Sequence, residues 1–399
     1  MAKRAIIVGG SLAGLFTGLL LRRIGWDVTI HERSGAELGS RGAGIVTHDS
    51  LHEILGLAVG YREHIGVGLT GRTVLDVNGE TVCENQNEQI VASWDQLWKR
   101  LRKAADGIYR HESVLQSFSQ NAAGAEVVFA DGSREKCTLL VAADGIQSTI
   151  RRTLMPDIES RYAGYIAWRG LVNKADLSQR TITQLFNRFG FCLPPSEQML
   201  GYPVDGGMDE QIRYNYVWYR PAHADDDLPC LLKGRDGKQY DGGIPPGQIH
   251  PDVILEMRDA ATRLLAPAFA EVVHKTRQPL LQPIIDLEVP TMRVGRTIML
   301  GDSAFVARPH VGMGVTKAAD DARALTGCLQ NDSDIDAALE AFSNERVAVG
   351  QRIIRRARHL GAYMQAQLLS DEERQRAEVH RNPQAVMVET ATTTGMESW

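Results

Sequence analysis

The stretch that decides the fold is residues 5–14, which read AIIVGGSLAG. Residues 5–8 are a continuous apolar run, which is typical of a strand buried on both faces. The glycines that follow predict a tight turn, and the apolar pattern of residues 12–24 predicts a helix. Residues 28–30 predict a second strand. The chain therefore begins with a strand–helix–strand unit of the kind that forms parallel sheets.

The turn matches a dinucleotide-binding loop at two of its three glycine positions. Gly9 and Gly14 fill the first and third positions, where a tight turn and close helix–strand packing require glycine, and Ser11 occupies the second. Glu32 stands at the end of the next strand, where a carboxylate can accept hydrogen bonds from a ribose diol. The alternative is a glycine-rich turn with an incidental glutamate, which the strand–turn–helix context disfavours.

Two later strands are predicted to end in an aspartate beside a glycine. Residues 139–145 read LLVAADG, and residues 297–302 read TIMLGD. The second strand is followed by RPHVGMG at residues 308–314, which leads into a predicted helix. The N–H groups at a helix N-terminus favour an anion, or a ring that accumulates negative charge. Each motif alone also fits a capped strand end or a loop interrupted by proline and glycine.

The middle of the chain is rich in β-forming residues. Strands are predicted at residues 162–173, 183–192, 198–204 and 211–220. In the last of these, Ile212, Tyr214, Tyr216 and Trp218 alternate with other residues, which indicates a sheet with two different faces. Residues 221–250 predict a loop. Helices are predicted at residues 95–111, 251–275, 314–329 and 333–369.

Composition restricts the class of protein. The 399 residues suggest two domains or one large one, and 43% hydrophobic with 23% charged residues is typical of a soluble globular protein. A net charge of −5 argues against a nucleic-acid partner. The five scattered cysteines predict free thiols in a reducing cytoplasm and no metal site. Glycines interrupt the apolar N-terminal segment, so we expect neither a signal peptide nor a membrane partner.

Taken together, the three motifs resemble those of the flavoprotein aromatic hydroxylases, and the resemblance extends from residue 3 to about residue 370. It implies an α/β fold: a Rossmann-like FAD-binding domain with an inserted, mostly antiparallel β-sheet substrate domain and C-terminal helices. The implied FAD-binding domain comprises residues 1–72, 95–160 and 285–330, the substrate domain residues 73–94 and 161–284, and the C-terminal helices residues 331–380. Residues 381–399 are expected to form a mobile tail.

The resemblance also implies which residues hold the cofactor, a non-covalently bound FAD. The residues that inherit this role are Gly9, Ser11, Leu12, Ala13, Gly14, Glu32, Arg33, Arg41, Asp144, Asp302, Pro309, Gly312, Met313 and Gly314. No second dinucleotide loop is present in the sequence, so NADH or NADPH would bind transiently as co-substrate. Four departures from the family pattern, Ser11, Ala142, Phe305 and Thr316, leave the flavin prediction intact but weaken any transfer of the substrate assignment.

The family activity implied is a monooxygenase that uses NAD(P)H and O₂ through a flavin C4a-hydroperoxide. The oxygen acceptor is a small electron-rich aromatic or N-heterocyclic compound. Residues 162–170, 202–203, 218–219, 308–310 and 317–322 resemble those of the members that hydroxylate 2,6-dihydroxypyridine. The resemblance therefore favours a hydroxylated pyridine as the substrate.

Hydroxylation of such a ring calls for a base that deprotonates a ring hydroxyl near neutral pH. The candidates are His48, slightly preferred, and His310, although either could simply form a hydrogen bond in a packed site. Tyr216 and Trp218 are candidates to line the substrate pocket and stack on an aromatic ring, with a place in the core as the alternative.

Two other classes of function stay open. One is a flavin enzyme of different chemistry on the same fold, such as a reductase, a halogenase or a decarboxylating hydroxylase. The other is a flavin-binding sensor without turnover. Oxidation of NAD(P)H that is stimulated by substrate and coupled to product would separate the hydroxylase from both. The sequence does not determine the oligomeric state, and a homodimer remains open.

Overall fold

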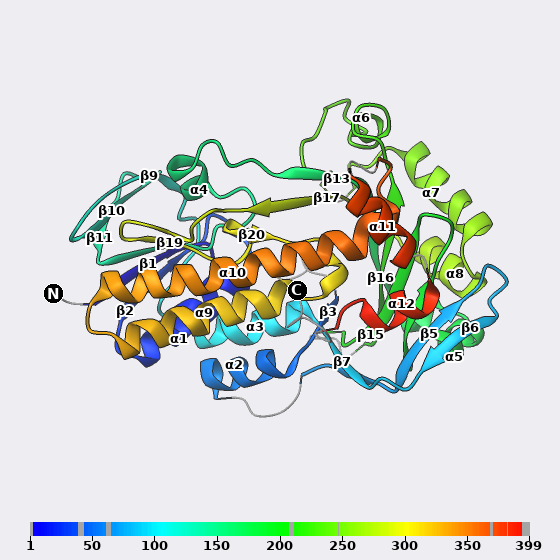
Figure 1. Cartoon of the computed structure of the whole chain (residues 1–399), viewed down its shortest axis with the longest axis horizontal. Coiled ribbons are helices and arrows are strands. Elements are labelled where there is room, and N and C mark those ends of the chain that lie inside the picture. Colours follow the sequence, from blue (N-terminus) through cyan, green and yellow to red (C-terminus); the bar gives the residue numbers. More distant parts are fainter. Residues whose placement is uncertain are drawn as a thin grey trace.

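The computed structural model describes residues 3–38, 44–60, 65–206, 211–245, 247–367, 370–380 and 382–392. Two sheets dominate it, and the long helix α10 (Ile335–Gly361) runs from one toward the other (Figure 1). Among the described residues, no helix is long and apolar enough to span a bilayer. The α/β fold class expected from the sequence is confirmed.

The first sheet has six strands in the order β18-β19-β12-β1-β2-β8. They are β1 (Arg4–Val8), β2 (Asp27–His31), β8 (Tyr109–Arg110), β12 (Leu139–Ala142), β18 (Arg293–Val294) and β19 (Thr297–Met299). Strands β1, β12 and β19 lie side by side and parallel, with Val8 opposite Ala142 and Ala142 opposite Met299. Their carboxyl ends therefore meet at one edge, which brings the three glycine-containing motifs together.

Helices and a small sheet surround this first sheet. Helices α1 (Leu12–Arg23), α2 (Asp49–Val59), α3 (Trp94–Ala104) and α9 (Gly314–Asn331) pack against one another on one side (Figure 1). An antiparallel sheet is formed by β9 (Leu115–Asn121), β10 (Gly124–Phe129) and β11 (Arg134–Cys137). The central strands are apolar and almost completely buried, as the runs in the sequence predicted.

The second sheet has eight strands in the order β20-β17-β13-β16-β15-β14-β5-β6. They are β5 (Gly71–Leu75), β6 (Thr81–Asn85), β13 (Arg161–Asn173), β14 (Arg188–Cys192), β15 (Gln198–Val204), β16 (Arg213–Pro221), β17 (Leu280–Glu288) and β20 (Phe305–Val306). All neighbouring pairs are antiparallel except β14 and β5. Strands β3 (Gly44–Val46), β7 (Gln89–Ser93) and β4 (Val67–Leu69) form a further sheet whose strand β7 approaches β15.

Several predicted elements differ from those observed. Residues 183–185 end helix α5 (Gln179–Leu185) instead of beginning a strand, and the predicted 221–250 loop contains α6 (Asp227–Leu231). The single helix predicted over 251–275 is two helices, α7 (Pro251–Leu264) and α8 (Pro267–Lys275), because Pro267 lacks the N–H that a continuous helix would need. The helix predicted over 95–111 ends at Ala104.

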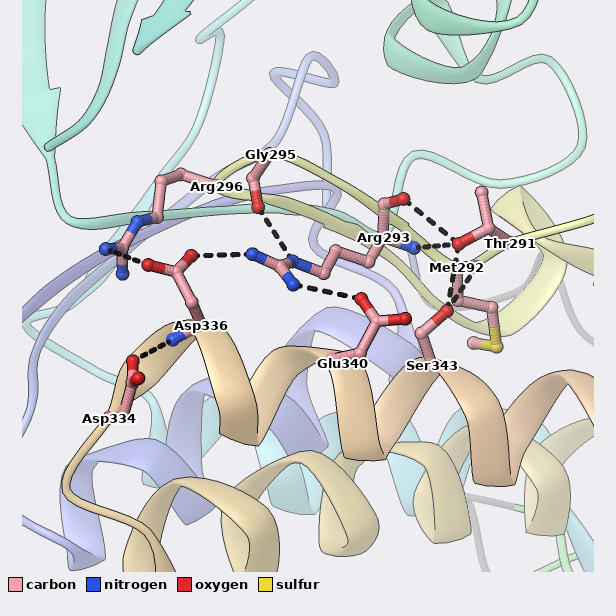
Figure 2. Close-up of polar contacts among 9 residues, drawn as sticks. All are labelled: Thr291, Met292, Arg293, Gly295, Arg296, Asp334, Asp336, Glu340 and Ser343. Atoms are coloured by element: carbon pink, nitrogen blue, oxygen red, sulfur yellow. Dashed lines mark hydrogen bonds and ion pairs between the residues drawn. The ribbon is translucent and has the colours of Figure 1, made fainter. Parts of the chain in front are cut away.

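Helix α10 is fixed at its start to the β18–β19 hairpin (Figure 2). The Arg293 guanidinium donates to Asp336 Oδ1 at 2.6 Å and to Glu340 Oε2 at 3.0 Å, and Arg296 donates to Asp336 Oδ2 at 2.8 Å. Asp334 caps the helix by accepting from the Asp336 N–H. These contacts hold the helix beside the strand that leads to the Gly-Asp motif.

The expected mobile tail does not apply to residues 382–392. This segment contains helix α12 (Pro383–Glu389), which follows α11 (Asp371–His380) and packs near β5 and β6. Val386 and Met387 are buried, and the Arg72 guanidinium donates to backbone carbonyls of the segment. The polar composition of the segment hid these two apolar anchors and their distant arginine partner.

Candidate functional site

The turn after β1 is shaped by close backbone contacts. Gly9 has a φ of +113°, and a Cβ there would lie 2.1 Å from the Ala143 carbonyl oxygen. A Cβ on Gly14 would lie 1.9 Å from the Gly9 carbonyl oxygen, so helix α1 presses directly against the turn. Ser11 is the N-cap, and Leu12 and Ala13 open the helix. Unpaired N–H groups of this first turn can bind a phosphate.

A groove of about 300 Å³ runs along the edge of the first sheet beside this turn. Its lining includes Ser11, Glu32, Arg33 and Asp144. The Glu32 carboxylate is buried and accepts from the Gly10 N–H at 2.8 Å and the Ser34 N–H at 2.9 Å. Each of its oxygens keeps a second lone pair, so the fixed carboxylate can also accept from ribose hydroxyls.

Asp144 contributes a buried oxygen to the same groove. Its Oδ2 accepts from the Thr149 N–H at 2.8 Å at the start of helix α4 (Thr149–Leu154). Its Oδ1 is buried without a hydrogen-bond partner among the described residues. Burial raises the pKa of this carboxyl. An unsatisfied buried acceptor is costly unless a ligand pairs with it, so this oxygen fits a hydroxyl-bearing cofactor such as FAD.

The Gly-Asp motif presents its carboxylate at the end of β19. Gly301 has a φ of +62°, and a Cβ there would lie 2.8 Å from the Ala13 side chain on α1. Asp302 is exposed, whereas Gly301 and Ser303 on either side of it are buried. The turn thus packs against the N-terminus of α1, where the pyrophosphate and ribityl part of FAD would lie, and Asp302 is the exposed residue of this turn.

A buried ionic cluster, which the sequence analysis did not assign to the site, holds this turn in place. Asp321 Oδ2 accepts from the Gly301 N–H at 3.1 Å, and Lys317 Nζ donates to the Gly301 carbonyl at 3.1 Å. Lys317 and Arg346 both pair with Asp321, at 2.9 and 2.8 Å. Burial alone would raise the pKa of Asp321, but these two cations hold it below its ordinary value. The i, i+4 spacing of Lys317 and Asp321 was the available signal.

The segment after Asp302 brings a histidine to the cofactor region. Pro309 begins a short 3₁₀ turn (Pro309–Val311), Gly312 has a φ of +64°, and the buried Met313 leads into α9 at Gly314. His48 Nε2 lies 3.4 Å from the Gly312 carbonyl oxygen. Burial lowers the pKa of His48, and the Arg72 charge lowers it further, so the imidazole is neutral at pH 7.

His310 has a different environment. Its Nε2 is 2.8 Å from the Tyr165 hydroxyl, and its ring packs between those of Tyr165 and Tyr219, at centroid distances of 5.8 and 4.3 Å. The residue is 1% exposed. The structure therefore brings both candidate bases to the 309–314 segment, but it places only His48 in a half-buried position beside it.

The prediction that Tyr216 and Trp218 line the substrate pocket is not supported by their positions. Both are 0% exposed and pack with apolar side chains of α7 and α8 on the outer face of the second sheet. The Trp218 indole donates to Glu197 Oε2 at 2.8 Å. The opposite face of β16 carries Asn215, whose Oδ1 accepts from the Gly44 N–H at 3.0 Å. Because both faces of the strand are buried, alternation could not tell which one faces the cofactor.

This placement predicts a stability effect at Trp218. Trp218→Ala should lower the free energy of unfolding by about 3–5 kcal/mol, because it leaves a large cavity in the core. Trp218→Phe, which keeps most of the packing but loses the bond to Glu197, should cost about 1–3 kcal/mol and leave the KM for the aromatic substrate unchanged. Urea unfolding and steady-state kinetics measure both. A tenfold higher KM with unchanged stability would instead place the indole in the site.

Two further residues predicted to hold the cofactor are Arg33 and Arg41. Arg33 is exposed at the groove. Arg41 lies outside the described residues. Tyr202, which was not among the predicted site residues, packs closely against Gly44. A Cβ on Gly44 would lie 2.5 Å from the Tyr202 ring.

Comparisons with known proteins agree with this geometry. A family model described as FAD binding domain-like matches residues 162–286. The chain is 27% identical over 366 residues to the 2,6-dihydroxypyridine 3-monooxygenase of Paenarthrobacter nicotinovorans, covering 91% of each chain. It is 25% identical over 393 residues to the 3-hydroxybenzoate 6-hydroxylase of Klebsiella oxytoca, covering 90% of this chain and 89% of that one.

The solved structure of 2,6-dihydroxypyridine-3-hydroxylase from Arthrobacter nicotinovorans superposes with a TM-score of 0.86. The sequence identity is 26%, and the match covers 92% of this chain and 93% of that chain. The shared architecture therefore spans both sheets. The chain is therefore similar over nearly its whole length to aromatic-ring monooxygenases, and the resemblance to flavoprotein aromatic hydroxylases that its three glycine-containing motifs predicted is confirmed.

Proposed function

We propose that this enzyme hydroxylates a hydroxylated pyridine, with NAD(P)H and O₂ as co-substrates. The observation that carries the proposal is a neutral, half-buried histidine, His48, which contacts Gly312. Gly312 belongs to residues 309–314, the segment that would wrap the flavin ring. An electron-rich ring becomes more reactive when one of its hydroxyl groups loses a proton, and a neutral histidine is the side chain suited to take it at pH 7. The relatives named for 2,6-dihydroxypyridine support the choice of ring.

Bound FAD supplies the redox chemistry: it takes up a hydride and activates O₂. The chain supplies position and proton transfer. Glu32, Asp144 and Asp302 would hold the hydroxyl groups of FAD through their carboxylate oxygens, and the N-terminus of α1 would bind its phosphates. The N-terminus of α9, at Gly314, would favour negative charge on a flavin ring bound beside it.

His48 has a defined proton-transfer atom in this arrangement. A carbonyl oxygen only accepts hydrogen bonds, so in the contact with Gly312 the hydrogen is on His48 Nε2. In the neutral ring the lone pair is then on Nδ1, which is the atom that would accept the substrate proton. The Gly312 carbonyl also stabilises the imidazolium that results, because it already accepts from Nε2.

The direct test is aerobic oxidation of NADH and of NADPH by the FAD-loaded protein, with and without 2,6-dihydroxypyridine, with the product followed by mass spectrometry. We expect the compound to stimulate oxidation and to gain one oxygen atom. Unsubstituted pyridine is the matched control, since it has no hydroxyl proton for His48 to remove, and it should give no hydroxylated product. Stimulation without product would mark 2,6-dihydroxypyridine as an effector and contradict the proposed substrate. A flavin sensor would show neither response.

A further inference from the structure

The C-terminal strap, residues 383–392, contributes to a cavity beside His48. This cavity has a volume of about 730 Å³, and its lining includes Thr47, His48, Gly68, Gln89 and Thr392. Thr392 comes from the far end of the described chain, whereas the other residues come from the first quarter of the sequence. The strap is therefore in a position to form one wall of the space next to the proposed base.

Arg72 on β5 seats the strap. Its guanidinium is 0% exposed and donates to the carbonyl oxygens of Met387 at 2.7 Å, Thr390 at 2.6 Å and Ala391 at 3.3 Å. Its fourth acceptor is Gln89 Oε1 at 2.7 Å, and Gln89 Nε2 in turn donates to the Ala391 carbonyl at 2.9 Å. Burial lowers the pKa of Arg72 to about 10, so it remains a cation at pH 7.

The strap also touches the segment that would wrap the flavin ring. The Ala391 N–H donates to the His310 carbonyl oxygen at 2.7 Å. A Cβ on Gly312 would lie 2.9 Å from the Ala391 side chain, so the two backbones are in contact. Because the Gly312 carbonyl is also 3.4 Å from His48 Nε2, the strap, this segment and His48 form one continuous surface.

The chemistry of the seat allows the strap to leave. Three of the four acceptors of Arg72 are backbone carbonyls of the strap, and no carboxylate of the described residues forms an ion pair with it. If the strap withdrew, water would reach Arg72 and replace these acceptors, and the 3.0 Å ion pair between Glu389 of the strap and the buried Arg356 of α10 would have to break as well. The outer side of the strap is open to solvent, with Val388 46% exposed.

We propose that the strap is a removable wall of the substrate cavity, seated by Arg72, whose release opens the His48 side for exchange of the aromatic substrate and product. The identity of the ligand rests on the proposed function, whereas the seating by Arg72 and the shielding of His48 do not. The two can therefore be tested separately.

The seating is tested on the full-length, FAD-loaded protein with Arg72→Gln. The matched control is Arg188→Gln on the neighbouring strand β14, where the arginine pairs with Glu84 instead of the strap. We expect Arg72→Gln to speed hydrogen exchange of the 386–392 amides at least tenfold. It should also speed modification of His48 by diethyl pyrocarbonate at least fivefold, read by mass spectrometry. The exposed His250 is the internal reference, and Arg188→Gln should change neither rate.

Gln89→Leu keeps the proposal falsifiable if Arg72→Gln does not fold, because it removes one hydrogen bond to Arg72 and one to the Ala391 carbonyl of the strap from a half-buried position. Unchanged exchange and unchanged His48 labelling in a folded Arg72→Gln, or in Gln89→Leu if that variant alone folds, would overturn the strap. For the ligand, saturating 2,6-dihydroxypyridine should slow exchange of the 386–392 amides at least threefold in the unmodified enzyme. If this compound changes neither turnover nor exchange while His48 labelling still responds to Arg72→Gln, the pyridine substrate fails and the shielding wall stands.

Discussion

Asp302→Ala should weaken FAD binding at least 100-fold and yield a largely colourless protein. Asp302 is the exposed residue of a turn whose flanking residues are buried and which packs against the N-terminus of α1. Hydrogen bonds to a charged acceptor contribute about 1.5–3 kcal/mol each, so the loss of one or two bonds accounts for a change of this size. Flavin absorbance after gel filtration and titration of the apoprotein with FAD measure it.

Asp320→Ala is the matched control, because it removes the same charge from the neighbouring helix and loses only a pair with the partly exposed Arg323. It should bind FAD normally. Asp321→Asn, in contrast, should weaken FAD binding, since it loosens the buried contacts that fix the Gly301 turn. Full flavin absorbance in Asp302→Ala, or equal losses in Asp302→Ala and Asp320→Ala, would contradict the assignment of Asp302.

His48→Asn should lower kcat by about 10²–10⁴-fold at pH 7 while FAD stays bound, which is the range typical of a lost general base. Because burial lowers the pKa of His48, its neutral form predominates above that lowered value. The rate of the unmodified enzyme should therefore rise with pH through a pKa below about 6.5 and be level near pH 7. The variant should lack this acidic limb, which a pH–rate profile at saturating substrate would reveal.

Two further histidine variants make this result specific. His52→Asn lies one helical turn from His48 and lines the same cavity, so it should retain the rate and the acidic limb. His310→Asn removes a ring packed between two tyrosines and should lower the free energy of unfolding instead. If His48→Asn keeps both rate and limb while a folded His310→Asn loses them, the base is His310.

Local sequence patterns predicted the first sheet and its glycine-containing turns well. The apolar runs at β1, β12 and β19 are followed by glycines whose positive φ angles or close contacts disfavour other residues. These motifs therefore predict the local backbone conformation. Parallel strands bring their ends to one edge, and this rule alone joins segments separated by nearly 300 residues.

The second sheet and the strap were less predictable, because residues far apart in the sequence form their contacts. Strand β16 alternates as expected, but helices α7 and α8 cover one face and Asn215 on the other contacts Gly44, so period-two alternation marks neither face as the site. The strap is polar in composition, and its position depends on Arg72, about 320 residues earlier, together with its buried Val386 and Met387. No pattern in the sequence of the strap or of β5 indicates that these two segments are in contact.

The strand order of the first sheet has a consequence for how the enzyme is made. Strand β12 is flanked by β1, from the first ten residues of the chain, and by β19, which ends at Met299. At about 5–20 residues per second, a ribosome needs roughly 15–60 s to deliver that last strand. Until then β12 has an open edge in the nascent chain, and the Gly-Asp turn has not yet been synthesised. FAD can therefore bind only late in synthesis, and the open edge of β12 in the nascent chain is where a chaperone would be needed.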